Sequence, residues 1–383
     1  MKYKLGDICE IVSGSTPKTS IPEYWDGDKK WITPAEINEE SYIITDSARK
    51  LTELGVKKTG LSPFPEGTVI LSSRAPIGKV AIAGCEMYCN QGFKNLICSE
   101  KINNRYLYWF LKGNTEFLNS LGRGATFKEV SKQIVSNIEI NVPSIAQQEQ
   151  AAIQLETANA IIRFRKQQLQ KLDELVKARF VELFGDESNP YNFPIVTIED
   201  VASVQVGVVI KPAQYYTDAG HGIKTFRSLN IGPMHIKDTD WVYFSEEGNR
   251  KNQKSVLNEN DLVIVRSGAP GTACVITKEY AGCNAVDIII ARPDLDKVNP
   301  YYLCQYTNLP HGKKQIEEGT GGAAQQHFNV GKYNKIRLTL PPLDQQLKFE
   351  KFVEQTDKSK LAVQKGLQEL EILKKTLMQQ YFG

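Results

Sequence analysis

The feature that most constrains the fold of this chain is an internal repeat that runs through its whole length. The opening "LGDICEIVSG" returns as "IEDVASVQVG", and "VILSSRAPIG" returns as "VIVRSGAPGT". The strongest match pairs "KLDELVKARFVELFG", ending at Gly185, with "ELEILKKTLMQQYFG", ending at Gly383. Matched segments are displaced by 193 to 198 residues, so the two copies are colinear with small insertions. Such a repeat predicts two equivalent units, each a head followed by a tail.

Composition is that of an ordinary globular protein. The 383 residues exceed one typical domain, and 41% hydrophobic with 24% charged residues is close to the average of soluble proteins. The opening "MKYKLGDICE" lacks the apolar core of an export signal, and no apolar run approaches the roughly 18 residues of a membrane helix. We therefore expect a cytoplasmic protein without membrane association.

Cysteine, histidine and net charge point to no particular site. The seven cysteines include no CxxC pair, and the four histidines lack metal-ligand spacing, so free and mostly buried thiols and no metal are expected. A formal charge of +3 cannot by itself indicate nucleic-acid binding. That function would need Lys and Arg gathered on one surface.

Each tail has the composition of a long helix. Between Ser144 and Phe184 there is no Pro or Gly, whereas Ala, Gln, Glu, Lys and Leu dominate. We expect heads at residues 1–143 and 186–341, and helices at residues 144–185 and 342–383. Apolar residues spaced mostly three and four apart predict a coiled-coil stripe on both helices. The stripe consists of Leu155, Ile162, Leu169, Leu172, Val176 and Leu183, and of Val353, Val363, Leu367, Leu370 and Leu377.

The two helices are expected to pair with each other. About 40 residues rise about 60 Å at 1.5 Å per residue, which is longer than a compact head needs. A long apolar stripe favours a partner of equal length, and the other tail has that length. Antiparallel pairing would place the heads at opposite ends with a pseudo-two-fold symmetry. The alternative is that each helix packs only on its own head.

The heads are predicted to be mixed α/β (α+β) domains that bind DNA. Short apolar runs such as "VAIA" and "DLVIV" alternate with turn-rich segments such as "SPFPEG" and "RSGAPG". The loops interleave aromatics with Arg and Lys, which suit guanine and phosphates, and with Asn and Gln, which suit adenine. Any one of these residues could be an ordinary solvated side chain, but their recurrence in corresponding loops favours readout. The candidates are Lys29, Lys30, Trp31, Arg74, Lys79, Asn90, Gln91, Lys94, Arg123 and Lys128 in the first head, and Lys211, Lys224, Arg227, Arg266, Asn284, His327 and Lys332 in the second.

Two Gly-rich segments, Gly122–Lys128 and Gly319–His327, have two interpretations. They could bring backbone amides close to phosphates, or they could be plain hairpin loops.

No catalytic residue is predicted. The Gly-Lys pairs are not followed by Ser or Thr, so no P-loop is present, and no Gly-x-Ser-x-Gly elbow occurs. "NPYNF" at Asn189 lacks the second proline of the amino-methyltransferase signature and fits a turn between the first tail and the second head. A two-headed chain without catalytic motifs is expected to bind a ligand that occurs twice.

Three pairs of motifs span essentially the whole chain in the same order. They are the two openings, the junctions "VPSIAQQEQ" and "LPPLDQQLK" that enter the helices, and the two helix ends. Together they resemble the DNA specificity subunit of type I restriction-modification enzymes. The first junction has Pro-Ser where that family commonly shows Pro-Pro, and the second has Gln-Leu in place of Gln-Glu.

The resemblance implies a function and a set of partners. Two target-recognition domains would read a split site in double-stranded DNA, and the helices would set the gap and dock two methyltransferase (modification) subunits. Restriction/translocase subunits would join that core in a prokaryotic cytoplasm. Methyl donor and ATP would bind to these partners, so no cofactor is expected on this chain. The alternatives are an autonomous two-headed repressor or architectural protein, and a methyltransferase or nuclease with diverged motifs.

Overall fold

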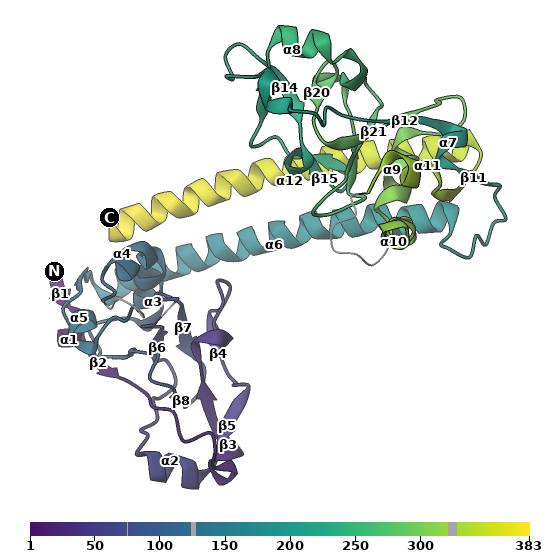
Figure 1. Ribbon diagram of the computed structural model, residues 1–383. Helices are drawn as coiled ribbons and strands as arrows, with labels where there is room; N and C mark the ends of the chain where they lie inside the picture. Colours follow the sequence, from purple (N-terminus) through teal and green to yellow (C-terminus); the bar gives the residue numbers. More distant parts are fainter. Residues whose placement is uncertain (75, 124–127, 321–327) are drawn as a thin grey trace. The chain divides into compact units, whose positions relative to one another are not determined.

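The computed structural model describes residues 1–74, 76–123, 128–320 and 328–383, which form two compact units (Figure 1). Unit 1 comprises Met1–Lys166 with Lys365–Gly383, and unit 2 comprises Gln167–Gln364. Each unit therefore combines one head with parts of both long helices.

A five-stranded sheet forms the centre of the first head. Its order is β2 (Cys9–Val12), β9 (Asn95–Cys98), β6 (Val69–Leu71), β7 (Val80–Ala83) and β4 (Ile43–Ile44), and only β4 and β7 pair in parallel. Because side chains alternate along a strand, Val69 and Leu71 enter the apolar cluster that holds α3 (Asn104–Gly113). Ile70 enters a second cluster with Phe93 on the opposite face. The sheet is therefore covered on both sides.

A smaller sheet carries the candidate residues near position 30. Its order is β5 (Arg49–Leu51), β3 (Trp25–Ile32) and β8 (Tyr88–Cys89), and α2 (Glu53–Thr59) packs beside it. Trp25 and Trp31 meet edge to face at 5.1 Å and form its core with Leu51 and Tyr88. The other elements are β1 (Lys2–Lys4) paired with β10 (Glu139–Asn141), α1 (Leu5–Ile8), α4 (Thr115–Ser120), α5 (Lys132–Ser136) and 3-10 turns at Pro22–Tyr24 and Pro34–Glu36.

The second head repeats this design. Its main sheet has the order β12 (Ala202–Val206), β21 (Ile288–Pro293), β18 (Leu262–Val265) and β19 (Ala273–Val275). Its second sheet has the order β13 (Tyr216–Thr217), β17 (Val242–Phe244), β14 (Ile223–Phe226) and β20 (Asn284–Ala285). As β3 does with β8, β14 pairs in parallel with β20. The mixed α/β class predicted for the heads is confirmed.

The remaining elements of the second head complete the correspondence. Strand β11 (Ile195–Thr197) pairs with β22 (Arg337–Thr339) as β1 does with β10, and β15 (Ile231–Gly232) forms a hairpin with β16 (His235–Ile236). The helices are α7 (Ile198–Val201), α8 (Glu246–Lys251), α9 (Pro300–Asn308), α10 (Pro310–Thr320) and α11 (Val330–Asn334), with 3-10 turns at Pro212–Tyr215, Ser228–Asn230, Gln253–Ser255 and Lys278–Tyr280.

A buried glutamine joins the start of the first long helix to its head. The amide nitrogen of Gln148 donates to the carbonyls of Pro143, at 2.9 Å, and Lys101, at 3.1 Å. Its amide oxygen accepts from the backbone N–H of Asn103 at 2.8 Å, and its side chain is inaccessible to solvent. One side chain thereby satisfies three backbone groups that would otherwise be buried without partners.

The second head has the same arrangement around Gln346. Its amide nitrogen donates to the carbonyls of Pro341, at 2.7 Å, and Lys297, at 3.4 Å. Its amide oxygen accepts from the N–H of Asn299 at 2.7 Å. The repeat seen in the sequence is therefore reproduced at the level of individual hydrogen bonds.

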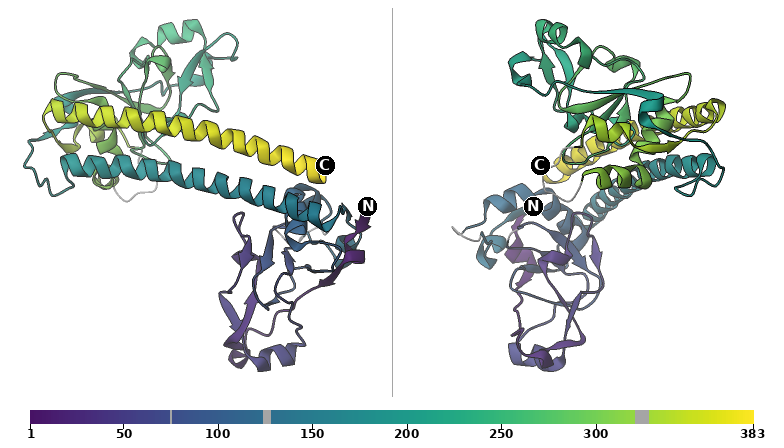
Figure 2. Two further views of the ribbon diagram at one scale, coloured as in Figure 1. Left: turned by 180° about the vertical axis from the view of Figure 1, so that it is seen from behind. Right: turned by 45° about the vertical axis from the view of Figure 1, so that its right-hand side comes forward.

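Two helices of 40 residues, α6 (Ile145–Phe184) and α12 (Leu343–Phe382), form the tails, against expected ranges of 144–185 and 342–383. Figure 2 shows each helix unbroken along its length. In unit 1, Tyr381 donates to Gln154 at 2.6 Å, and Lys374 donates to Asn159 at 2.7 Å.

In unit 2, the ammonium of Lys360 lies 2.8 Å from the carboxylate of Asp173, and the Phe180 and Phe349 rings meet at 5.3 Å. In both units, residue numbers rise along one helix as they fall along the other. The prediction of antiparallel pairing is therefore confirmed within each unit.

The predicted apolar stripe is buried or half-buried at all of its positions. Near the helix starts, Leu155 and Val353 belong to the core of their own heads. The alternative of packing on the helix's own head thus holds for the first turns, and helix pairing holds farther along.

The far ends of the helices pack differently from their starts. Phe184, which ends α6, packs on Tyr302 of the second head at 4.8 Å. Phe382, which ends α12, packs on Tyr106 of the first head at 4.9 Å. Each tail therefore completes the core of the other repeat's head.

The cysteines, all within the described ranges, are free, and Cys85 and Cys98 are half-buried while the other five are buried. Among the residues with described positions, no cluster of three or more His, Cys, Asp or Glu side chains could hold a metal ion. No helix in the described ranges combines the length and apolarity needed to cross a membrane.

Candidate nucleic-acid interface

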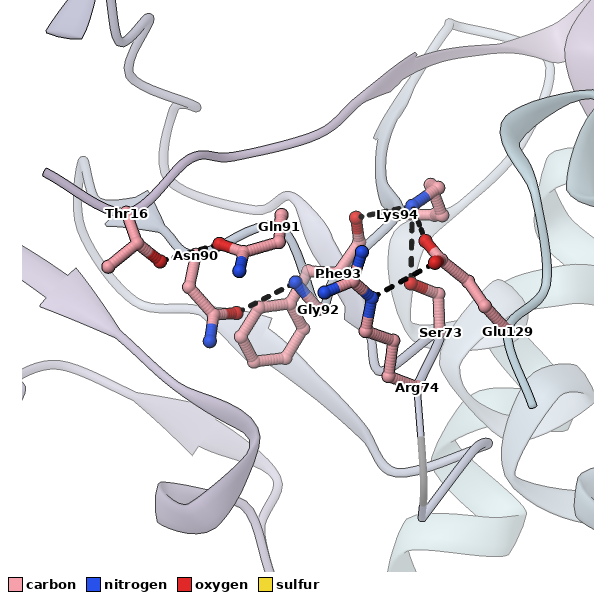
Figure 3. Close-up of polar contacts among 9 residues, drawn as sticks. All are labelled: Thr16, Ser73, Arg74, Asn90, Gln91, Gly92, Phe93, Lys94 and Glu129. Atoms are coloured by element: carbon pink, nitrogen blue, oxygen red, sulfur yellow. Dashed lines mark hydrogen bonds and ion pairs between the residues drawn. The ribbon is translucent and has the colours of Figure 1, made fainter. Parts of the chain in front are cut away.

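The first head gathers several predicted residues in one polar cluster, here called the first rim, in which Ser73 and Lys94 are buried and the other members are at least partly exposed. It consists of Ser73, Arg74, Asn90, Gln91, Lys94 and Glu129 (Figure 3). Strand β6 ends at Leu71, and the chain then passes Arg74, which forms an isolated bridge with Glu129. The segment from residue 90 to residue 94 lies directly before β9. Strand ends of the main sheet therefore position these side chains.

One carboxylate organises the cations of the first rim. The oxygens of Glu129 lie 3.0 Å from Nε of Arg74 and 3.2 Å from Nζ of Lys94. Figure 3 marks both contacts with dashed lines. Partial burial works to raise the pKa of Glu129, but Lys94 and Arg74 outweigh it and hold that pKa below its ordinary value. The side chain of Arg74 remains 45% exposed, so it is oriented by Glu129 and still accessible.

Two neighbouring carboxamides extend the first rim. Asn90 accepts from the backbone N–H of Gly92 at 2.9 Å, and Gln91 accepts from the hydroxyl of Thr16 at 2.5 Å. These contacts use the amide oxygens and fix the side-chain orientation (Figure 3). Carboxamides have the paired donor and acceptor that adenine requires in the major groove.

Other predicted residues of the first head lie apart from the first rim. Lys29 pairs with Asp28 at 3.1 Å on β3, and Lys30 donates to the thiol of Cys85 at 3.3 Å. Lys79 donates to a backbone carbonyl, that of Pro34, at 2.9 Å. Arg123 and Lys128 are exposed on either side of residues 124–127, which lie outside the described part.

Three predicted contacts are corrected by their burial. Trp31 is 2% exposed and donates to the carbonyl of Ser15, and Asn284 is inaccessible and bonded to Ser255 and Asn249. Lys94 is 7% exposed and supports Glu129 from inside. Trp31 packs in the core of the smaller sheet with Trp25, Leu51 and Tyr88, so it shares no exposed surface with its neighbours Lys29 and Lys30.

The second head presents an equivalent surface, here called the second rim: Val206, Val209, Arg266, Asp287 and Asn329. With Val330 and Gly331 they line a hollow of about 360 Å³. The guanidinium of Arg266 lies 2.5 Å from the carboxylate of Asp287 and donates from Nε to the carbonyl of Phe328 at 3.2 Å. As in the first head, a carboxylate holds an arginine at a strand end of the main sheet.

The other predicted cations of the second head are dispersed. Lys224 pairs with Asp238 at 2.9 Å, a contact that raises its pKa, and lies over the ring of Trp241. Arg227 donates to the carbonyl of Asp240. The remaining three are Lys211, which is exposed, Lys332 in the first turn of α11, and His327, which lies outside the described residues.

Sequence reasoning missed the acidic member of each rim and the apolar members of the second rim. Glu129 and Asp287 were overlooked because a search for cations and amides does not include the acids that orient them. Ile210, beside the second rim, is 76% exposed, and an exposed β-branched residue is visible only in the structure. Its signal in the sequence is the apolar run "VGVVI", which has the polar "SGSTP" as its counterpart.

Two α/β heads with organised polar rims, each bound to a pair of long helices, define a duplicated recognition protein. The chain belongs to the type I restriction modification DNA specificity domain family, whose model matches residues 1–174 and again residues 171–372. It is a specificity subunit of a type I restriction-modification system, the subunit class that recognises DNA sequence.

Curated relatives span most of the chain. The type I restriction enzyme MjaIX specificity subunit of Methanocaldococcus jannaschii is 28% identical over 374 residues, covering 92% of this chain and 85% of that protein. The EcoprrI specificity subunit of Escherichia coli is 21% identical over 384 residues, covering 92% and 86%.

Solved structures share the fold. The S subunit of a type I restriction-modification system from M. genitalium aligns over 100% of this chain and 96% of its own, with a TM-score of 0.61 and 14% identity. A structure concerned with complex assembly and conformational transition of the type I R-M system aligns over 100% and 97%, with a TM-score of 0.61 and 17% identity.

Proposed function

We propose that each head reads one half of a bipartite DNA target and that the two half-sites differ in sequence. The supporting observation is that the two rims lie at strand ends of similar sheets but carry different side chains. The first rim has Arg74 beside Asn90 and Gln91, whereas the second has Arg266 and Asp287 beside Val209. Different donors, acceptors and apolar groups select different base edges.

The carboxylates give the rim cations a defined orientation. Arg74 and Arg266 are each held by a charge-assisted contact before DNA binds, so less conformational entropy is lost on binding. An oriented guanidinium can donate two hydrogen bonds to guanine, and Asn90 or Gln91 can pair with adenine. Exposed lysines such as Lys128 and Lys211 add sequence-independent phosphate contacts.

The helices, on this proposal, dock two methyltransferase (modification) subunits, and restriction/translocase subunits join through them. Support comes from large apolar side chains that stay exposed although the helices pair. On α6, Ile161, Phe164 and Leu175 are 38%, 60% and 48% exposed, and on α12, Leu361 and Ile372 are 68% and 66% exposed. Spacings of three and eleven residues place such side chains on one helix face. Methyl donor and ATP would bind to those partners and not to this chain.

Helix length would set the gap between the half-sites. At 1.5 Å per residue, 40 residues rise about 60 Å, and duplex DNA rises about 3.4 Å per base pair. A gap of fixed length therefore follows from two helices of fixed length.

A rim substitution tests the assignment of one half-site to each head. The complex assembled with its modification subunits would carry N90A/Q91A, and its methylated target would be mapped by sequencing. We expect altered bases in one half-site only, with Gln150→Ala on the exposed side of α6 as the unaffected control. Changes in both halves would contradict the proposal.

A paired deletion tests the spacer role. Removing one heptad from each helix, residues 163–169 and 366–372, keeps the apolar stripe in phase and shortens each helix by about 10 Å. The gap is expected to shrink by about 3 base pairs. An unchanged gap would contradict the spacer role, and methylation or cleavage by this chain alone would favour an enzyme.

A further inference from the structure

The segment that follows β12 in the second head exposes apolar side chains beside the second rim. Val206, Val209 and Ile210 are 36%, 47% and 76% exposed. Exposed apolar residues of this size, next to one another, carry a cost in water that contact with a ligand removes.

The backbone of this segment is held in place. The N–H of Val208 donates to the carbonyl of Ala285 at 2.8 Å, and the N–H of Asp287 donates to the carbonyl of Val208 at 3.2 Å. A side chain at Gly207 would come within 2.5 Å of the Ala285 carbonyl, so glycine is needed for this approach. Ile210 is therefore presented from an anchored strand extension.

The chain turns directly after Ile210. Lys211 has a φ of 42°, in the left-handed region, and Pro212 then begins a 3-10 turn. Such a conformation in a residue other than glycine is uncommon and costs energy, which is a feature often found at functional sites. The turn leaves Ile210 at the outermost point of the segment, with the cation of Lys211 next to it.

The surroundings of the segment suit one edge of a base pair. Val206 and Val209 line the hollow that also contains Arg266, Asp287 and Asn329. Thymine offers a 5-methyl group next to the O4 acceptor in the major groove, and its partner adenine offers a donor and an acceptor. An apolar surface beside arginine and carboxamide groups matches that pattern, and the nearby cations match the phosphates.

The first head shows that the backbone hydrogen bonds of this segment do not require these apolar residues. There the N–H of Ser15 donates to the carbonyl of Cys89 at 3.0 Å, as Val208 does to Ala285. The next residue is Thr16, whose hydroxyl donates to Gln91. The position of Val209 thus carries the polar Thr16 in the first head, and the position of the exposed Ile210 carries the buried Pro17.

We propose that Val209 and Ile210 contact the 5-methyl groups of thymines in the half-site read by the second head, and so determine its sequence. This inference rests on the proposed function, in which each head reads its own half-site. Ile210 supplies most of the contact because it is the most exposed, and Arg266 and Asn329 supply the neighbouring polar contacts.

The experiment removes the methyl group from the DNA. The complex with its modification subunits would bind duplexes in which each thymine of the second half-site is replaced in turn by deoxyuridine, which keeps the hydrogen-bonding groups. At one or two positions we expect binding by the native complex to weaken about fivefold, the value of one buried methyl-sized group. Ile210→Ala is expected to weaken binding to the thymine duplex about tenfold and to remove most of the preference for thymine over deoxyuridine.

Two controls locate the effect. Leu229→Ala removes another exposed apolar residue of the same head, 60% exposed, and should retain the preference for thymine. Deoxyuridine in the first half-site should have the same effect on native and Ile210→Ala complexes, because the contact belongs to the second head.

Several outcomes would overturn the inference. One is a full thymine preference in the Ile210→Ala complex. Another is weaker binding by Ile210→Ala without any deoxyuridine effect, which would indicate a minor-groove wedge or a protein contact. A second half-site without an A·T pair would also exclude it. If Ile210→Ala altered bases in both half-sites, the proposed function itself would fail.

Discussion

The two heads share the buried hydrogen bonds that join each head to its long helix, and they differ in the side chains of their rims. Gln148 and Gln346 make the same three hydrogen bonds in their respective heads. The rim carboxylates come from different places: Glu129 precedes α5 in the first head, whereas Asp287 precedes β21 in the second. The difference teaches that the hydrogen bonds that join head to helix constrain both copies, while rim side chains can change without disturbing the fold.

The largest expected effect concerns the aromatic clusters around Phe184 in unit 2 and around Phe382 in unit 1. It tests whether they contribute equally to the stability of their units. Phe184 is 1% exposed among Phe180, Tyr302 and Phe349, whereas Phe382 is half-buried. We expect Phe184→Ala to destabilise unit 2 by about 3–5 kcal/mol and Phe382→Ala to destabilise unit 1 by about 1–2 kcal/mol.

Hydrogen exchange resolved by peptide, with increasing urea, would measure both values. Leu373→Ala, at a residue 49% exposed, is the matched control and should change stability little. Equal losses from the two phenylalanine substitutions would show that the clusters are equivalent after all.

The next prediction tests the glutamine hydrogen bonds that both heads share. Gln148→Ala and Gln346→Ala each leave buried backbone groups without partners, so each should cost about 2–4 kcal/mol. The two costs should agree within about 0.5 kcal/mol, because their environments match. Hydrogen exchange in each head, recorded during thermal unfolding, measures both losses of stability. Clearly unequal losses would show that the two glutamines are not equivalent.

A smaller effect should distinguish the rims by pH. Glu129→Gln should destabilise the first head by about 1–2 kcal/mol at neutral pH, because Lys94 then keeps a buried charge without its partner. The folded-state pKa of Glu129 lies below its unfolded value, so its contribution is complete above the unfolded pKa and is lost as pH falls through the folded one.

The difference between native and Glu129→Gln proteins should therefore shrink as the pH falls below the ordinary glutamate pKa of about 4.3. Asp287→Asn, at a carboxylate 54% exposed that serves one cation, should cost less. Urea unfolding from pH 3 to pH 8 measures both, and a difference that is as large at pH 3 as at pH 8 would argue against the Glu129 ion pairs.

The smallest effect concerns phosphate contacts and should be alike in both heads. Lys128→Gln and Lys211→Gln each remove one exposed cation near a rim. Each should reduce the slope of log affinity against log salt by about 0.9 and leave the recognised sequence unchanged. Fluorescence anisotropy across a salt series measures this, and an altered target sequence would place the lysine at a base.

Much of the fold could be predicted because its determinants are local. The range of the first helix follows from the absence of Pro and Gly between Ser144 and Phe184, and the pairing of the helices follows from the spaced apolar stripe. Where each helix changes partner could not be predicted: Leu155 and Phe184 are both apolar stripe-face residues, yet one packs on its own head and the other on the second head.

The candidate site was predictable only in part. Arg74 follows β6, and Asn90 and Gln91 lie in the segment before β9, which pairs with β6 in the main sheet. Trp31 was misplaced because the choice between core and surface depends on strand alternation within a folded sheet. The pairing of Arg74 with Glu129 depends on contact between segments far apart in the sequence, which no local pattern encodes.

The exchange of helix ends has a consequence for synthesis on the ribosome. Unit 2 is one continuous stretch, so all of its residues are synthesised before residues 365–383 are. Unit 1 lacks residues 365–383 until they are made, so Tyr106 has no Phe382 to pack on until then, although it was made far earlier. Because domains generally fold from the N-terminus during translation, this protein inverts the usual order: the head made first is the last to be completed.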